Sequence, residues 1–188
     1  MKEQYDLFFT IIISDVLIIL GLGLILFLAG VWEALLWRTS WFQFCNYPIQ
    51  AHWFGKNKKW RGLITLPLTH LFIVILLRYI AVDFLNLSTP FASFTFSEVC
   101  RYGLLVGLVF NLSELPNSFL KRRLNIPAGD ESHWLFCWCD RIDSTYGTLL
   151  LLYFYFHFPG HLVGLGLAIS PFLFMGTTWV RRQLGLKK

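Results

Sequence analysis

Seventeen consecutive uncharged residues follow Asp15, and nearly all of them are apolar. A helix of about this length can cross the hydrocarbon core of a bilayer, because each residue adds ~1.5 Å along the helix axis. A cleavable signal peptide would have a basic start and a shorter apolar run, whereas this segment opens with one lysine and two acidic residues. The stretch therefore predicts a retained membrane-spanning helix.

Four more apolar segments follow the first along the chain. Hydrophobic residues make up 56% of the 188 residues and charged residues only 14%, against roughly 25% charged in ordinary soluble domains. We therefore predict an all-α integral membrane protein that forms one domain over residues 1–188. The five predicted spans are 7–32, 63–82, 99–115, 134–158 and 161–180.

The distribution of lysine and arginine predicts the orientation of these spans. The cations gather after the first and third spans and in the tail after the fifth, while the N-terminus and the alternate loops hold only Lys2. The positive-inside rule then places the N-terminus outside and the C-terminus in the cytoplasm. Basic residues that border apolar segments usually set topology or meet anionic phosphates. We therefore expect a protein of the cytoplasmic membrane, with no nucleic-acid partner.

Two polar residues, Ser14 and Asp15, interrupt the first apolar segment. Either they form a polar pair inside the membrane, or they cap a helix that begins in the outer headgroup layer. The residues after Asp15 suffice to cross a bilayer, which favours the cap.

A basic, aromatic segment precedes the second predicted span and ends in HWFGKNKKWRG, where two glycines bound the cations. One interpretation is an ordinary positive-inside flank. The other is a glycine-bounded loop whose backbone and lysines approach phosphates. Composition alone favours the flank. The cations are Lys56, Lys58, Lys59 and Arg61.

A second basic stretch follows the third predicted span, and we expect it to form a loop from Pro116 to about Glu131. Its cations, residues 121–123, precede Asp140 and Asp143 by about twenty residues. The two aspartates are three residues apart on a predicted helix, so their carboxylates project from one face. Clustered cations and paired carboxylates at a membrane margin suit a polyphosphate with its Mg²⁺.

A purely structural interpretation of these carboxylates is also open. Buried carboxylates are costly unless they are neutralised, and ion-pair networks can resemble functional sites. In that case Arg141 or Arg122 would neutralise the aspartates as a lock. Glu114 is similarly either a further metal ligand or a partner of Arg122.

Three pieces of the sequence resemble the CDP-archaeol synthase family. They are FGKNKKWRG at 54–62, ELPNSFLKRRL at 114–124 and DRIDSTYG at 140–147. The middle piece is the most specific of the three because it is long and unusual. The resemblance covers roughly residues 54–147 together with the layout of the spans.

The sequence departs from the family pattern at three positions. Lys59 stands where the family usually has threonine, Arg141 where a glutamine is usual, and Gln50 where an aspartate follows Pro-Ile. None of these departures removes a carboxylate or a cation from the three pieces. They bear on the substrate and on the geometry around Arg141.

The resemblance implies that CMP is transferred from CTP to the phosphate of a glycerol-phosphate lipid at the cytoplasmic face, which yields a CDP-lipid and pyrophosphate. It implies Mg²⁺ as cofactor, held by Asp140 and Asp143 with Glu114 as a further candidate. Lys121 and Arg122 join the aspartates as candidate catalytic residues. The residues implied to bind nucleotide or phosphate are Lys56, Asn57, Lys58, Arg61, Asn117, Ser118, Lys121, Arg122 and Arg123.

Two rival functions come from other classes of protein. CDP-alcohol phosphotransferases also act on CDP-lipids, but their DG-x2-AR-like run is absent from this sequence. A non-catalytic membrane protein or transporter subunit would use the charges for topology only. That alternative leaves ELPNSFLKRR unexplained.

Overall fold

The computed structural model describes residues 2–87, 89, 91–127, 130 and 133–185, and all the regular elements within them are helical. The predicted all-α class is therefore confirmed for the described chain. The elements are α1 (Lys2–Leu36), η1 (Gln43–Cys45), α2 (Ala51–Phe54), α3 (Trp60–Arg78), η2 (Tyr79–Phe84), α4 (Phe96–Leu112), α5 (Glu114–Arg123), α6 (Trp134–Phe154) and α7 (Gly160–Gln183).

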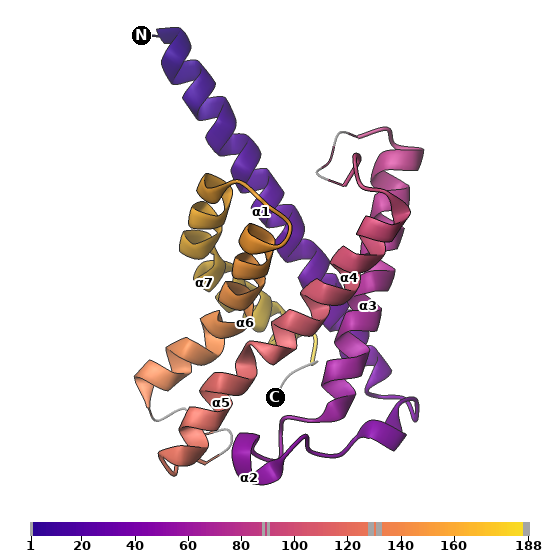
Figure 1. Ribbon diagram of the computed structural model, residues 1–188, viewed down its shortest axis with the longest axis vertical. Helices are drawn as coiled ribbons and strands as arrows, with labels where there is room; N and C mark the ends of the chain where they lie inside the picture. Colours follow the sequence, from indigo (N-terminus) through magenta and orange to yellow (C-terminus); the bar gives the residue numbers. More distant parts are fainter. Residues whose placement is uncertain (1, 88, 90, 128–129, 131–132, 186–188) are drawn as a thin grey trace.

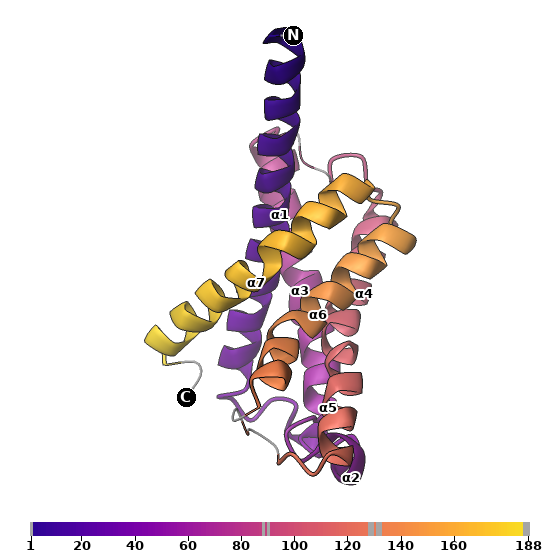
Figure 2. The ribbon, with the colours of Figure 1, turned by 90° about the vertical axis from the view of Figure 1, so that its left-hand side faces the viewer.

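The helices form a bundle around α1 and the pair α3 and α4 (Figure 1). The long helix α1 packs against α3 on one side and against α7 on the other, while α4 packs against α3 and α6. Helix α5 continues from the end of α4, and α2 lies beside it. Figure 2 shows that α7 crosses the bundle obliquely.

Within the described part of the chain, four helical segments are long and apolar enough to cross a membrane, which is what an integral membrane protein requires. Helix α6, which we predicted to be a span, is not among the four because its first turns carry three charged residues. The count of five spans therefore stays a prediction. The four segments are Ile11–Leu36, Trp60–Phe84, Phe96–Arg123 and Gly160–Val180.

Two glycines let α4 approach α3 closely. A Cβ atom on Gly103 would lie 2.7 Å from the Cα of Leu71, and one on Gly107 would lie 2.6 Å from the Cα of Pro67. This is the Gly-x-x-x-Gly spacing by which membrane helices pack backbone to backbone. The contact fixes the helix pair from which the polar end of the molecule is built.

We expect Gly107→Ala to lower the melting temperature of the detergent-solubilised protein by at least about 3 °C, since overpacking costs ~1–3 kcal/mol. The added methyl group would meet backbone atoms, which cannot rotate away. Gly164→Ala is the matched control, because a Cβ there meets nothing within 4 Å. Equal melting temperatures for the two variants would contradict this account of the α3 and α4 contact.

We predicted a loop from Pro116 to about Glu131. This prediction is wrong from Pro116 to Arg123, because these residues belong to helix α5. Pro116 occupies the third position of the helix, where its missing N–H would have no partner inside the helix in any case. The cations of residues 121–123 form the last turn, which favours positive charge. The rest of the predicted loop includes positions 128, 129, 131 and 132, which lie outside the described residues.

Helix α1 runs through Ser14 and Asp15 without a break, so the cap interpretation is wrong. The side chain of Asp15 is buried, and its Oδ2 lies 3.3 Å from Nε2 of His161 at the start of α7. The polar pair therefore forms between two helices rather than between neighbours in the sequence. Its partner relieves the cost of placing a carboxylate inside an apolar helix.

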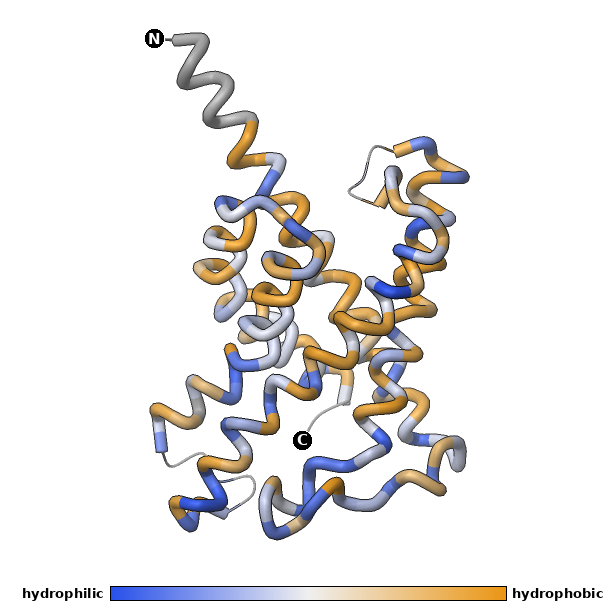
Figure 3. Tube along the Cα trace, viewed as in Figure 1, coloured by the Kyte–Doolittle hydropathy of each residue, from blue (hydrophilic) through white to orange (hydrophobic). Residues whose placement is uncertain are grey.

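Polar residues concentrate at one end of the bundle, around α2, α5 and the first turns of α6 (Figure 3). The end of α7 lies near the same region, because Nη2 of Arg38 donates a hydrogen bond to the carbonyl of Gly185 at 3.1 Å. The basic segments that we predicted to share one side of the membrane thus lie at one end of the molecule. We call it the polar end.

Candidate functional site

The first half of α6 packs against α5 at the polar end (Figure 1). Gly147 permits a close approach, because a Cβ atom there would lie only 1.8 Å from Oγ of Ser113, which joins α4 to α5. This packing sets the first turns of α6 opposite the ELPNSFLKRR helix. Two pieces of the family resemblance therefore face each other.

Asp140 and Asp143 converge on a single side chain of α5. Nδ2 of Asn117 donates hydrogen bonds to Oδ1 of Asp140 at 2.7 Å and to Oδ2 of Asp143 at 3.2 Å. The backbone N–H of Ser144 donates to the other oxygen of Asp143 at 2.7 Å. The two carboxylates thus share one face of α6, as their spacing predicted.

Lys121 is the cation that pairs with this carboxylate site. Its Nζ lies 2.5 Å from Oδ2 of Asp140, and its side chain is only 6% exposed whereas that of Asp140 is 45% exposed. A buried ammonium is costly without a partner, so the contact fixes both side chains. The lock interpretation named Arg141 or Arg122, but Arg122 instead donates a hydrogen bond to the carbonyl of Ile126.

Glu114 connects all three sequence motifs. Its carboxylate pairs with Lys58, which is fifty-six positions earlier in the sequence, and accepts a hydrogen bond from Oγ of Ser144 at 2.8 Å. The same hydroxyl lies 3.2 Å from Oδ1 of Asp143. The predicted alternative that Glu114 pairs with Arg122 is therefore wrong.

Negative charge is in excess around Asp143. The carboxylates of Asp143 and Glu114 are both partly buried and both contact the hydroxyl of Ser144, so their negative charges repel each other. Three carboxylates lie here against the two lysines that pair with them, Lys58 and Lys121. A cation bound at this position would relieve the repulsion between Asp143 and Glu114.

The donors of this site suit Mg²⁺ in particular. Mg²⁺ prefers oxygen ligands, and proteins usually hold it through one or two carboxylates together with water and substrate phosphates. Asp140 and Asp143 provide two such carboxylates. Among the described residues, no group of three histidine, cysteine, aspartate or glutamate side chains could hold a metal ion. Two carboxylates are compatible with Mg²⁺ by their chemistry, and such an ion would need its other oxygen ligands from outside these side chains.

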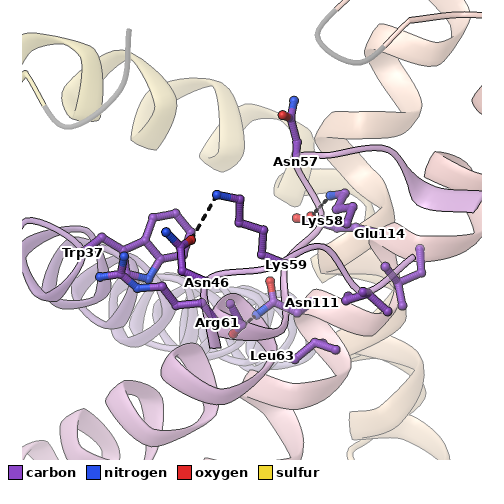
Figure 4. A pocket seen from close by; sticks show the side chains of 12 residues that line it. Trp37, Asn46, Asn57, Lys58, Lys59, Arg61, Leu63, Asn111 and Glu114 are labelled. Atoms are coloured by element: carbon purple, nitrogen blue, oxygen red, sulfur yellow. Dashed lines mark hydrogen bonds and ion pairs between the residues drawn. The ribbon is translucent and has the colours of Figure 1, made fainter. Parts of the chain in front are cut away.

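A cavity of about 470 Å³ opens beside Glu114 and carries three cationic side chains in its wall (Figure 4). We call it the cationic cavity. Arg61 is buried in this wall, with its guanidinium 5.5 Å from the ring centre of Trp37. The lining residues are Trp37, Asn46, Ile49, Asn57, Lys58, Lys59, Arg61, Gly62, Leu63, Asn111, Glu114 and Leu115.

Backbone and side-chain hydrogen bonds hold residues 58–62, which supply the cations of the cavity wall, in place. The N–H of Ile49 donates to the carbonyl of Lys58 at 2.9 Å, and Nζ of Lys59 donates to Oδ1 of Asn46 at 3.0 Å (Figure 4). Nδ2 of Asn111 donates to the carbonyl of Gly62 at 2.7 Å. The segment is therefore held as part of the cavity wall, whereas a positive-inside flank would need no such contacts.

The remaining predicted site residues lie outside these contacts. Lys56 is exposed and is not among the residues that line the cationic cavity. Ser118 is buried on α5, and the guanidinium of Arg123 lies 4.9 Å from the ring centre of Phe119. The structure thus brings together Lys58, Glu114, Asn117, Lys121 and the two aspartates, but not Lys56 or Arg123.

Several residues of the site were not found from the sequence. Ser144 directly follows Asp143, and its position next to a predicted ligand was the available signal. Asn111 is a lone amide in an apolar span, which also marks a functional position. Trp37 and Asn46 gave no signal, because aromatic and polar residues are common at membrane interfaces.

A comparison with protein families found a match to the CarS-like family, described as CDP-archaeol synthase, over residues 50–188. The matched range includes the three motifs and all the carboxylates and lysines of the site. A search among curated proteins found no match, and a search among solved structures found none. Because the matched range covers well over half of the sequence, the chain belongs to the CDP-archaeol synthase family.

Proposed function

We propose that this protein transfers CMP from CTP to the phosphate of a membrane glycerol-phosphate lipid, which forms a CDP-lipid and releases pyrophosphate. One observation carries the proposal. Within the family-matched region, Lys121 pairs with Asp140 and Lys58 pairs with Glu114, and the hydroxyl of Ser144 links Glu114 to Asp143. These contacts lie beside a cavity with a cationic wall. This arrangement suits a nucleoside triphosphate with its metal ion.

The chemistry demands charge neutralisation more than proton transfer. An oxygen of the lipid phosphate is already ionised and attacks the α-phosphorus of CTP, which forms a P–O bond while the bond to the β-phosphate breaks. No strong base is required. The protein must hold two polyanions in line and stabilise the charge that gathers on the leaving pyrophosphate.

Asp140 and Asp143 would hold Mg²⁺, with Glu114 next to them. When bound, Mg²⁺ would neutralise the phosphate oxygens and orient the triphosphate. Asn117 fixes the direction of both carboxylates through its two hydrogen bonds, so it is a positioning residue. Ser144 does the same for Asp143 and Glu114.

The cations have distinct proposed roles. Lys121 and Lys58 pair with carboxylates in the structure, and both would turn to phosphate oxygens once Mg²⁺ occupied the aspartates. Arg61 and Asn57 in the cationic cavity would contact the nucleotide. We retain three further predicted phosphate-binding residues as candidates for the lipid phosphate or the nucleotide. They are Lys56, Ser118 and Arg122, whereas the predicted Arg123 packs on the ring of Phe119 and is assigned no role.

We also propose a location and orientation for the enzyme. Five crossings, with α6 as the fourth and its charged first turns in the headgroup layer, place the N-terminus outside and the polar end in the cytoplasm of a cell bounded by this membrane. The three cations in the last turn of α5 and those in the wall of the cationic cavity lie at the polar end, which supports this orientation. CTP is cytosolic and the lipid phosphate lies in the headgroup layer, so the two would meet at this surface.

Release of pyrophosphate tests the proposal. Purified protein in lipid nanodiscs is expected to release pyrophosphate only when CTP, Mg²⁺ and a lipid phosphate are all present. Ether-linked isoprenoid and acyl glycerol phosphates should be offered in parallel, because the apolar spans do not identify the chains. No release with any lipid phosphate would favour the non-catalytic alternative.

A further inference from the structure

Arg61 lines the cationic cavity, and its guanidinium is held there by the end of α1. Nη2 of Arg61 donates a hydrogen bond to the carbonyl of Leu36 at 3.1 Å, and the guanidinium lies 5.5 Å from the ring centre of Trp37 (Figure 4). Leu36 is the last residue of α1, where carbonyl groups have no partner within the helix and favour a cation. These two contacts therefore fasten the start of α3 to α1 at the wall of the cavity.

A buried chain of hydrogen bonds runs through the same junction. Nε1 of Trp37 donates to Oγ1 of Thr65 at 3.2 Å, and this hydroxyl donates to Oε1 of Glu33 at 2.7 Å. The hydroxyl also lies 2.9 Å from the backbone carbonyl of Arg61, one turn earlier on α3. Thr65 is fully buried, so water does not compete for these contacts. The chain therefore fixes the ring of Trp37 on which the guanidinium of Arg61 packs.

A cation and an acid are both buried at this junction. Arg61 is 5% exposed and Glu33 is 8% exposed. Burying such groups is costly unless hydrogen bonds and nearby opposite charges compensate. Nε of Arg61 is also buried, and it makes no hydrogen bond within the described residues. Arg61 is thus held in place by α1 while one of its donors still lacks an acceptor, as expected of a side chain that binds an anion.

We infer that Glu33, Thr65 and Trp37 hold Arg61 in the position from which it contacts the nucleotide, so that the end of α1 sets how tightly the cationic cavity binds CTP. The three are positioning residues, because they act through Arg61. The inference rests on the proposed function, in which Arg61 contacts the nucleotide. Glu33 and Trp37 precede the family-matched range, which begins at residue 50. The nucleotide site of this chain thus depends on a helix that the family match does not include.

Removal of the hydroxyl at the centre of the chain tests the inference. Thr65→Val keeps the shape of the side chain but neither accepts from Trp37 nor donates to Glu33, whereas Thr65→Ser keeps the hydroxyl. We expect Thr65→Val to raise the dissociation constant of CTP with Mg²⁺ about tenfold, because it displaces a charge-assisted contact. Thr65→Ser should restore the constant to within about twofold of wild type, and the KM for lipid phosphate should change less than about twofold in both variants.

A double-mutant cycle separates an effect through Arg61 from a general loosening of the fold. Lysine keeps the positive charge but lacks the planar group that meets Leu36 and Trp37. In an Arg61→Lys background, Thr65→Val should therefore change the dissociation constant of CTP less than about twofold. If the effects of the two substitutions multiply instead, the inference is overturned.

Chemical modification of Arg61 gives a readout that needs no nucleotide. The rate at which phenylglyoxal modifies Arg61 would be followed by mass spectrometry, with the exposed Arg38 as internal reference. We expect Thr65→Val and Trp37→Phe to raise the rate at Arg61 about fivefold or more, because local opening exposes the guanidinium more often. Trp32→Phe is the matched control on α1, since the ring of Trp32 is exposed and stacks on Phe72. It should leave the rate unchanged.

The outcomes separate this inference from the proposed function. If wild-type protein binds no CTP but Thr65→Val makes Arg61 reactive, the proposed function fails and the positioning of Arg61 by α1 stands. If wild-type protein binds CTP and Thr65→Val equals Thr65→Ser in both readouts, the inference is overturned. Should Thr65→Val fail to fold, Trp37→Phe decides, and equal rates at Arg61 in Trp37→Phe and Trp32→Phe overturn the inference.

Discussion

Asp143→Asn is expected to lower CTP-dependent pyrophosphate release by about a hundredfold to a thousandfold, the range found when a single charge-stabilising group is removed from an active site. The substitution keeps the shape of the side chain and its contact with Asn117 but removes its charge. Because Asp143 is partly buried and lies close to the carboxylate of Glu114, a neutral side chain should not destabilise the fold. The measurement is the rate at saturating CTP across a Mg²⁺ titration.

Asp83→Asn provides the control for that substitution. Asp83 makes an exposed ion pair with Arg78, away from the three motifs of the candidate site. Exposed pairs contribute little, so this variant should keep its rate within about twofold. A full rate for Asp143→Asn would show that the metal assignment is wrong.

Lys121→Met should have the second largest effect, a loss of about a hundredfold in kcat/KM for CTP. The ammonium group of Lys121 is buried against Asp140, so its removal takes away the cation that pairs with this carboxylate. Methionine keeps most of the buried volume, and Asp140 is exposed enough to regain water once its partner is removed. We therefore expect a folded but weakly active protein.

Arg123→Met is the matched control on the same turn of α5. Its guanidinium packs on the ring of Phe119 rather than on a carboxylate of the site. Its rate should fall no more than about threefold, as for an exposed cation with little net contribution. If Lys121→Met and Arg123→Met lowered kcat/KM for CTP equally, the ion pair of Lys121 with Asp140 would have no role of its own in the reaction.

Most of the confirmed predictions came from the hydrophobic segments and from the spacing of the aspartates. Apolar runs long enough to cross a bilayer predicted the helical membrane class, because the backbone must satisfy its own hydrogen bonds there. The three-residue spacing of Asp140 and Asp143 predicted a shared face, and both contact Asn117. The resemblance to the family was also confirmed.

Contacts between distant segments could not be predicted from local patterns. Nothing in either motif indicates that Lys58 pairs with Glu114, because this contact depends on how the loop before α3 folds over the start of α5. The contact between His161 on α7 and the carboxylate of Asp15 on α1 is likewise not indicated by the sequence around either residue. Pro116 led us to predict a loop where α5 begins, because proline usually ends helices. In the first turn of a helix, however, a proline costs no hydrogen bond.

The central claim is that the aspartates of α6 and the lysines next to them form a single site for CTP and Mg²⁺. Calorimetric titration of CTP into the purified protein, with and without Mg²⁺, tests it most directly. Wild-type protein should bind CTP at least about tenfold more tightly with Mg²⁺, and the Asp140→Asn/Asp143→Asn double variant should lose that difference. CTP binding that is indifferent to Mg²⁺, and equal in both proteins, would contradict the account.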